Sequence, residues 1–184
     1  MANRGGSRAL RFIESKRLRL IAATPDLVAS DLAGRASLGE SLQVEVPDNW
    51  PPELYDRPAM EYALRVLEDA ATQGWSFWYL IRKDEAVERV IGIGGFKGRP
   101  DERGSVEIGY SILPQFRYRG FATEAVARLV NWAFTFSLVR EVCAETLPHL
   151  KQSIRVLEKN GFEFTGAGSE HGVTRYAVGR ARLN

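Results

Sequence analysis

The sequence is poor in cysteine and histidine, which excludes several kinds of site. Its 184 residues include one cysteine, Cys143, and two histidines, His149 and His171. A single cysteine can form no disulfide within the chain and no cysteine-based zinc site. We therefore expect no bound metal, and a reducing compartment, the cytoplasm, as the location.

Long apolar runs are also missing. No stretch approaches the length that crosses a bilayer, and the first residues lack the apolar segment of a secretory signal. The 25 basic and 23 acidic residues nearly balance, at a formal net charge of +2. This balance gives no reason to expect nucleic acid or a membrane as a partner. With no repeat or linker-like composition, we expect one domain over residues 1–184, with residues 1–12 as a flexible tail.

The spacing of apolar residues predicts the elements of that domain. A helix is expected to open at Thr24, a possible N-cap followed by Pro25. The order of elements favours an α/β fold of the mixed α+β kind, with six to seven mostly antiparallel strands and about four helices. Strands are expected near residues 17–22, 75–81, 90–96, 105–113, 139–146, 162–165 and 173–178, and further helices near 60–71, 120–134 and 150–157.

The turn before the 120–134 helix carries the chemistry. A helix N-terminus presents unpaired backbone N–H groups and a partial positive charge, which suit an anion. Gly120 lets the backbone approach a ligand closely, and Ala122 keeps the first turn free of a bulky side chain. Arg117 and Arg119 add charge that can meet phosphate oxygens. The turn therefore predicts a pyrophosphate site.

These residues resemble a known family. Arg117-x-x-Gly120-x-Ala122 is similar to the [Gln/Arg]-x-x-Gly-x-[Gly/Ala] signature of the GNAT acetyltransferase superfamily. The runs at 106–110, 118–125 and 153–162 look like its ribosomal-protein N-terminal acetyltransferase branch, and the similarity extends from about Arg17 to the C-terminus. Three blocks in the right order are much more specific than the six-residue pattern.

The resemblance implies an N-acetyltransferase that uses acetyl-CoA. The acetyl group would pass to a primary amine, either a protein N-terminus or a small molecule, by direct attack in a ternary complex. The backbones of Ile112 and Leu113 would pair with the pantetheine arm. The residues expected to bind the coenzyme are Ile112, Leu113, Arg117, Tyr118, Arg119, Gly120, Phe121, Ala122 and Thr123.

Attack by an amine requires a proton acceptor, because free amines are mostly protonated at neutral pH. Glu107 is the first candidate: the alternation places it opposite Val106 and Ile108, and Gly109 leaves room beside it. Glu145, on the next expected strand, is the second candidate. A surface ion pair is the alternative role for either carboxylate.

The proton donor for the departing thiolate is less evident. Many family members carry a tyrosine where this chain has Leu157, and an asparagine where it has Leu150. By the resemblance, the Ser153 hydroxyl is the remaining candidate for contact with the coenzyme sulfur, and a local helix cap is its alternative role. Cys143 is interpreted as a buried strand residue and not as a nucleophile.

The acceptor site is the least patterned part of the sequence. Trp50 lies in a proline-rich segment where family members often place a lid, so we expect it to contact substrate. Glu45, Asp48 and Glu53, with Glu40, make this segment acidic and favour a cationic acceptor.

Two other functions remain open at this point. A non-catalytic acyl-CoA sensor would explain the missing tyrosine and asparagine. A nucleic-acid-associated protein could use Arg117, Arg119, Arg99 and Arg103, although no recognised nucleic-acid motif accompanies them. A homodimer is possible, and the sequence does not specify the oligomeric state.

Overall fold

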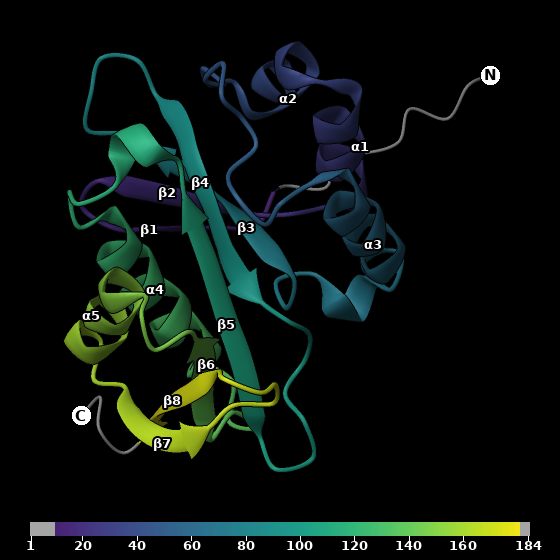
Figure 1. Cartoon of the computed structure of the whole chain (residues 1–184). Coiled ribbons are helices and arrows are strands. Elements are labelled where there is room, and N and C mark those ends of the chain that lie inside the picture. The colour runs from purple at the N-terminus through teal and green to yellow at the C-terminus, as the bar shows by residue number, and fades with distance from the viewer. Residues whose placement is uncertain (1–9, 181–184) are drawn as a thin grey trace.

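A computed structural model describes residues 10–180, which form one layered α/β unit (Figure 1). The sheet runs in the order β1-β2-β3-β4-β5-β6-β8-β7. Short 3₁₀ turns at Ala70–Thr72 and Pro114–Phe116 complete the chain. The strands and helices are β1 (Phe12–Glu14), β2 (Leu18–Ala22), α1 (Pro25–Ala33), α2 (Arg35–Leu42), α3 (Arg57–Leu67), β3 (Phe77–Arg82), β4 (Arg89–Phe96), β5 (Ser105–Ile112), α4 (Phe121–Ala133), β6 (Glu141–Thr146), α5 (Lys151–Lys159), β7 (Glu163–Ala167) and β8 (Thr174–Gly179).

The predicted fold class is confirmed, with one strand and one helix more than expected within the described residues. The additional strand is β1, in which Phe12 pairs with Ile21 and Glu14 with Arg19. Phe12, the last residue of the predicted tail, lies in this strand, and residues 1–9 of that prediction lie outside the described residues. The additional helix is α2, which Gly34 separates from α1 at a φ of 129°. Gly34 breaks the helical path because this φ is favourable only for glycine.

The helices cover both faces of the sheet. Successive strand residues point to opposite faces, and β3 shows both: the Trp78 ring packs on Trp132 of α4, whereas the Tyr79 hydroxyl reaches Asp31 of α1. Figure 1 shows α4 and α5 on one side and α1 to α3 on the other. The apolar stripe of α4 supplies much of the core, as its spacing predicts: the buried residues are Phe121, Ala125, Val126, Leu129, Val130 and Ala133.

The sheet splits between β5 and β6. These strands form a parallel pair that ends after three positions, Ser105 with Glu141, Val106 with Val142 and Glu107 with Cys143. Beyond this point β5 stays paired with β4 as far as Ile112, and β6 stays paired with β8 as far as Thr146. Each strand therefore continues in an extended form while the two separate, which opens the edges that face each other.

Trp50 lies in the core and not at an acceptor lid. It is 8% exposed, and its Nε1 donates a 2.8 Å hydrogen bond to the Asp31 carboxylate, which also accepts a bond of 3.1 Å from the Tyr79 hydroxyl. Burial raises the pKa of Asp31, and the two hydrogen bonds oppose that rise. The segment around Trp50 is thus fastened to α1 and β3 through one buried carboxyl.

We expect Trp50→Phe to destabilise the fold by about 1–3 kcal/mol, because it removes a donor from a buried polar group. Chemical denaturation of the wild-type and variant proteins measures this difference in the free energy of unfolding. In an Asp31→Asn background the cost of Trp50→Phe should shrink, since a neutral amide oxygen accepts a weaker hydrogen bond than a carboxylate. An unchanged midpoint for Trp50→Phe alone would contradict the structural role.

Candidate active site

A cavity of about 800 Å³ occupies the opening between β5 and β6. Its walls are the separated parts of these strands, at 107–112 and 144–147, together with one face of α5. The start of α4 lies at one end, and the loop between β7 and β8 contributes Ser169, Glu170 and Val173. The cavity therefore joins the predicted pyrophosphate site to both predicted catalytic carboxylates.

The N-terminus of α4 borders the cavity. Gly120 is the N-cap residue, with a φ of 80°, and no side-chain hydrogen bond caps the helix there. Gly120, Phe121, Ala122 and Thr123 all line the cavity, as the sequence predicts. The first amides of the helix have no carbonyl partner within it, so they can bind an anion at this end.

The two predicted phosphate-binding arginines differ in their surroundings. Arg117 lines the cavity, but its guanidinium donates to the Ile112 carbonyl at 2.8 Å and to Glu53 at 2.9 Å. Arg119 is outside the cavity lining, and its guanidinium lies over the Phe121 ring. Tyr118, between them, lines the cavity with an exposed side chain and has a φ of 62°. The backbone amides of α4, more than these guanidinium groups, therefore face the cavity end.

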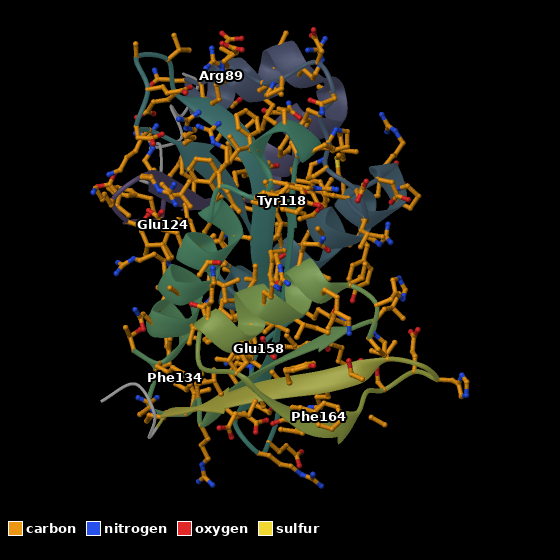
Figure 2. The ribbon with its side chains drawn as sticks, turned by 60° about the vertical axis from the view of Figure 1, so that its left-hand side comes forward. Arg89, Tyr118, Glu124, Phe134, Glu158 and Phe164 are labelled. Atoms are coloured by element: carbon orange, nitrogen blue, oxygen red, sulfur yellow. The ribbon has the colours of Figure 1, made fainter. Side chains whose placement is uncertain are left out.

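Glu124 anchors this turn to the connection between β1 and β2, a contact that the sequence reasoning missed. Its carboxylate accepts hydrogen bonds from the Ser15 hydroxyl at 2.7 Å and from the Arg17 amide and Nε at 2.8 and 2.7 Å. Arg17 also donates to the Arg119 carbonyl at 2.9 Å. Burial alone would raise the pKa of Glu124, but the bonds from Ser15 and Arg17 outweigh it and lower the pKa. Figure 2 labels Glu124 and Tyr118 on opposite sides of the start of α4, and Glu124 is outside the cavity lining, so the anchor leaves the cavity side free.

The backbone groups of Ile112 and Leu113, both expected to pair with the pantetheine arm, point to opposite sides of β5. The Leu113 amide donates to the Ile91 carbonyl at 2.9 Å, and the Glu107 carbonyl accepts from the Lys97 amide at 2.9 Å. In an antiparallel pair, alternate residues direct both backbone groups to the same neighbour. Leu113 is thus committed to β4, and it is outside the cavity lining, whereas Tyr110 and Ile112 direct their backbone groups to the open edge. Of the two residues predicted to pair with the pantetheine arm, Ile112 therefore faces the open edge and Leu113 does not.

Glu107 lies where β5 and β6 separate. It belongs to the last shared pair, lines the cavity and forms an ion pair with the exposed Lys97. A Cβ added at Gly109 would meet nothing within 4 Å, so the predicted space beside Glu107 is present. The carboxylate faces the cavity from the middle of the sheet and can reach a bound molecule.

Glu145 also lines the cavity, but the β7–β8 loop occupies its carboxylate. The Ser169 hydroxyl donates to it at 2.7 Å and the Ser169 amide at 2.8 Å. These bonds lower the pKa of Glu145. The geometry favours a role in holding the loop over one as proton acceptor.

Ser153 faces the cavity from α5 and meets an unexpected partner. The Tyr110 hydroxyl lies 3.1 Å from both the Ser153 hydroxyl and the Ser153 carbonyl oxygen. The sequence placed Tyr110 on the core face of its strand, yet it lines the cavity because β6 has already separated there. Leu157 is buried, so no hydroxyl replaces the family tyrosine at its position.

Cys143 is buried and outside the cavity lining, as its interpretation as a core residue predicts. Its sulfur lies 3.7 Å from the Ser105 hydroxyl, and burial raises the pKa of the thiol. A raised pKa disfavours the thiolate, so the geometry supports no nucleophilic role.

The acidic segment predicted to attract a cation is largely neutralised. Glu45 pairs with Arg89, Asp48 with Arg35 and Glu53 with Arg117. Glu107 and Glu145 on the sheet and Glu170 on the β7–β8 loop also contribute carboxylates to the cavity lining.

Neither a metal cluster nor a membrane span is found in the described part of the chain. Between residues 10 and 180, no three His, Cys, Asp or Glu side chains gather closely enough to hold a metal ion. Over the same residues, no helix has the length and apolar character needed to cross a bilayer.

Comparison with known proteins places the chain in a family. Residues 17–163 match the acetyltransferase (GNAT) domain. YjdG of Bacillus subtilis (strain 168), named as an uncharacterized N-acetyltransferase, is 29% identical over 162 residues, which cover 87% of this chain and 94% of that protein.

Solved structures share the fold at low identity. The ribosomal-protein-S5-alanine acetyltransferase of Vibrio fischeri superposes with a TM-score of 0.67 at 15% identity, covering 95% of this chain and 99% of that one. The microcin C7 self-immunity acetyltransferase MccE, solved with acetyl-CoA and AMP, gives 0.63 at 13% identity, over 90% and 93% of the two chains. With its splayed sheet and helix-bordered cavity, and above all with a domain match over most of its length, the chain belongs to the GNAT acetyltransferase family and is an N-acetyltransferase.

Proposed function

We propose that this enzyme transfers the acetyl group of acetyl-CoA to a primary amine, on a protein N-terminus or a small molecule, by direct attack in a ternary complex. The observation that carries the proposal is the single cavity that connects the N-terminus of α4 to the carboxylate of Glu107. An anionic coenzyme needs positive charge, and a cationic amine needs negative charge. The N-terminus of α4 provides the first at one end of the cavity, and Glu107 provides the second at the other.

The coenzyme would bind along the open edge of β5. The amides that begin α4 would hold its pyrophosphate, helped by the partial positive charge of the helix N-terminus. The pantetheine arm would then pair with the backbone groups of Tyr110 and the amide of Ile112 at that edge, as an added strand does, while the Ile112 carbonyl keeps its hydrogen bond from Arg117. This path brings the thioester between β5 and α5, close to Ser153 and Glu107.

Glu107 would act as the base, directly or through a water molecule. The amine nitrogen attacks the thioester carbonyl, the carbon–sulfur bond breaks with its electron pair on sulfur, and the amine proton passes to the carboxylate. Glu107 is favoured over Glu145 because Ser169 already donates two hydrogen bonds to Glu145. Lys97, which is largely exposed, can move from Glu107 when the amine enters.

The acceptor would be a cationic amine. Glu107, Glu145 and Glu170 contribute carboxylates to one end of the cavity, which attract a positively charged molecule. Among these carboxylates, Glu107 pairs with the largely exposed Lys97, which an incoming ammonium group would replace, whereas Glu45, Asp48 and Glu53 pair with arginines.

We expect Gly120→Glu to weaken acetyl-CoA binding by more than about tenfold, because it places a carboxylate against the pyrophosphate. The φ of 80° adds strain for any residue with a side chain. Gly172→Glu is the matched control, since Gly172 has a φ of 83°, open space for a Cβ and a place on the β7–β8 loop. Calorimetric titration of the folded variants measures both affinities, and equal affinity in the two would refute the placement of the pyrophosphate.

We expect Glu107→Gln to lower kcat by about 10²–10⁴-fold with little change in acetyl-CoA affinity, because the amide cannot accept the amine proton. Thiol release is followed with the primary amine that the wild-type enzyme uses fastest. Glu145→Gln should lower kcat much less, and an equal loss in both variants would contradict the assignment of the base. Absence of any amine-dependent thiol release by the wild-type protein would favour the sensor function.

We expect 1,4-diaminobutane to be acetylated with a kcat/KM about tenfold above that of butylamine, because its second ammonium group can meet the cavity carboxylates. The two amines have similar size and the same reacting group, so thiol release at equal pH and ionic strength isolates the effect of charge. Equal rates would contradict a cationic acceptor site.

A further inference from the structure

The Tyr110 and Ser153 hydroxyl groups meet across the cavity. Tyr110 comes from β5 and Ser153 from the first turn of α5, 43 residues apart in the chain, and their hydroxyl oxygens lie 3.1 Å apart. Gly94 of β4 lies opposite Tyr110, and a Cβ added at Gly94 would lie 3.4 Å from the Tyr110 Cβ and 3.3 Å from the Leu129 Cδ1. A glycine opposite the tyrosine thus leaves the room that the ring needs beside α4.

The hydrogen-bond geometry allows two arrangements of the protons. If the phenol donates to the Ser153 carbonyl oxygen, the serine hydroxyl can donate to the phenol, and its proton points away from the cavity. If the phenol donates to the serine oxygen instead, the serine proton is free to point into the cavity. Each hydroxyl has one proton, so the phenol controls where the serine proton points.

We propose that Tyr110 is a positioning residue that directs the Ser153 hydroxyl toward the sulfur of the bound thioester. This inference rests on the proposed function, which brings the thioester to this part of the cavity. It also accounts for Leu157, since a serine oriented from β5 supplies the hydroxyl that the family tyrosine would otherwise supply from α5.

The proposed contact needs no proton from Tyr110. When the carbon–sulfur bond breaks, sulfur takes the electron pair, and the Ser153 hydroxyl donates a hydrogen bond to the thiolate, which later gains a proton from solvent. The phenol stays protonated throughout and donates a hydrogen bond to the serine oxygen. Burial raises the pKa of Tyr110 more than the hydrogen bond with Ser153 lowers it, so the phenol remains a donor at neutral pH.

Kinetics of Tyr110→Phe, Ser153→Ala and the double variant test the proposal. We expect Tyr110→Phe to lower kcat by about 10- to 100-fold, the range for loss of a hydrogen bond to a charged group, with the KM for acetyl-CoA changed less than about twofold. The double variant should be no slower than Ser153→Ala, because Tyr110 acts only through the serine. Tyr176→Phe, on β8 outside the cavity lining, is the control and should leave kcat unchanged.

A binding measurement gives a second readout that does not depend on turnover. The wild-type enzyme should bind CoA more tightly than desulfo-CoA, which lacks the sulfur, and both single variants should lose that preference. Multiplicative losses in the double variant, a full preference for CoA in Tyr110→Phe, or normal kcat in Ser153→Ala would overturn the inference. If these outcomes occur while the wild-type protein binds CoA and acetylates its amine, the inference fails and the proposed function stands. If the wild-type protein binds no CoA, the inference and the proposed function are both refuted.

Discussion

The structure depends on the point at which β5 and β6 stop pairing. Both strands have a partner on their outer side, so they can separate after Glu107 and Cys143 without unfolding either half of the sheet. Separation leaves backbone groups of β5 without a strand partner, at an edge that faces the cavity. An extended ligand that pairs with this edge satisfies those groups, and the same gap gives Glu107 access to what the ligand carries.

Much of this arrangement could be predicted from local sequence. The period of the apolar residues gave the predicted strands and four of the helices, and Gly120 followed by an amphipathic run marked the start of α4. The helix start that carries the expected anion site was predictable, because the free backbone amides of a first turn need no distant partner. The β1 strand was missed because three residues with little burial produce a weak pattern.

Contacts between distant segments could not be predicted in this way. Glu124 looks like an ordinary first-turn carboxylate in sequence, and only the fold brings it to Ser15 and Arg17. Trp50 lies in a proline-rich segment, a composition expected of a lid, yet its hydrogen bond to a buried carboxylate 19 residues earlier holds it in the core. Leu113 is adjacent to Ile112, but the alternation of the antiparallel pair turns its amide to the opposite strand. In each case the role of the residue is set by the distant segment that it contacts and not by its own side-chain type.

The same reasoning explains how the departures from the family pattern can be compatible with catalysis. A hydroxyl near a thioester sulfur is defined by its position in space, and several backbone positions can supply it. Leu157 fills the core where the family tyrosine would stand, while Tyr110 approaches from β5 and meets Ser153. The partner also distinguishes the carboxylates. Those on the 45–53 segment pair with arginines, whereas Glu107 on β5 lines the cavity and pairs with a largely exposed lysine. Motif positions predict which backbone is present, and the geometry of the cavity decides which side chains can serve the reaction.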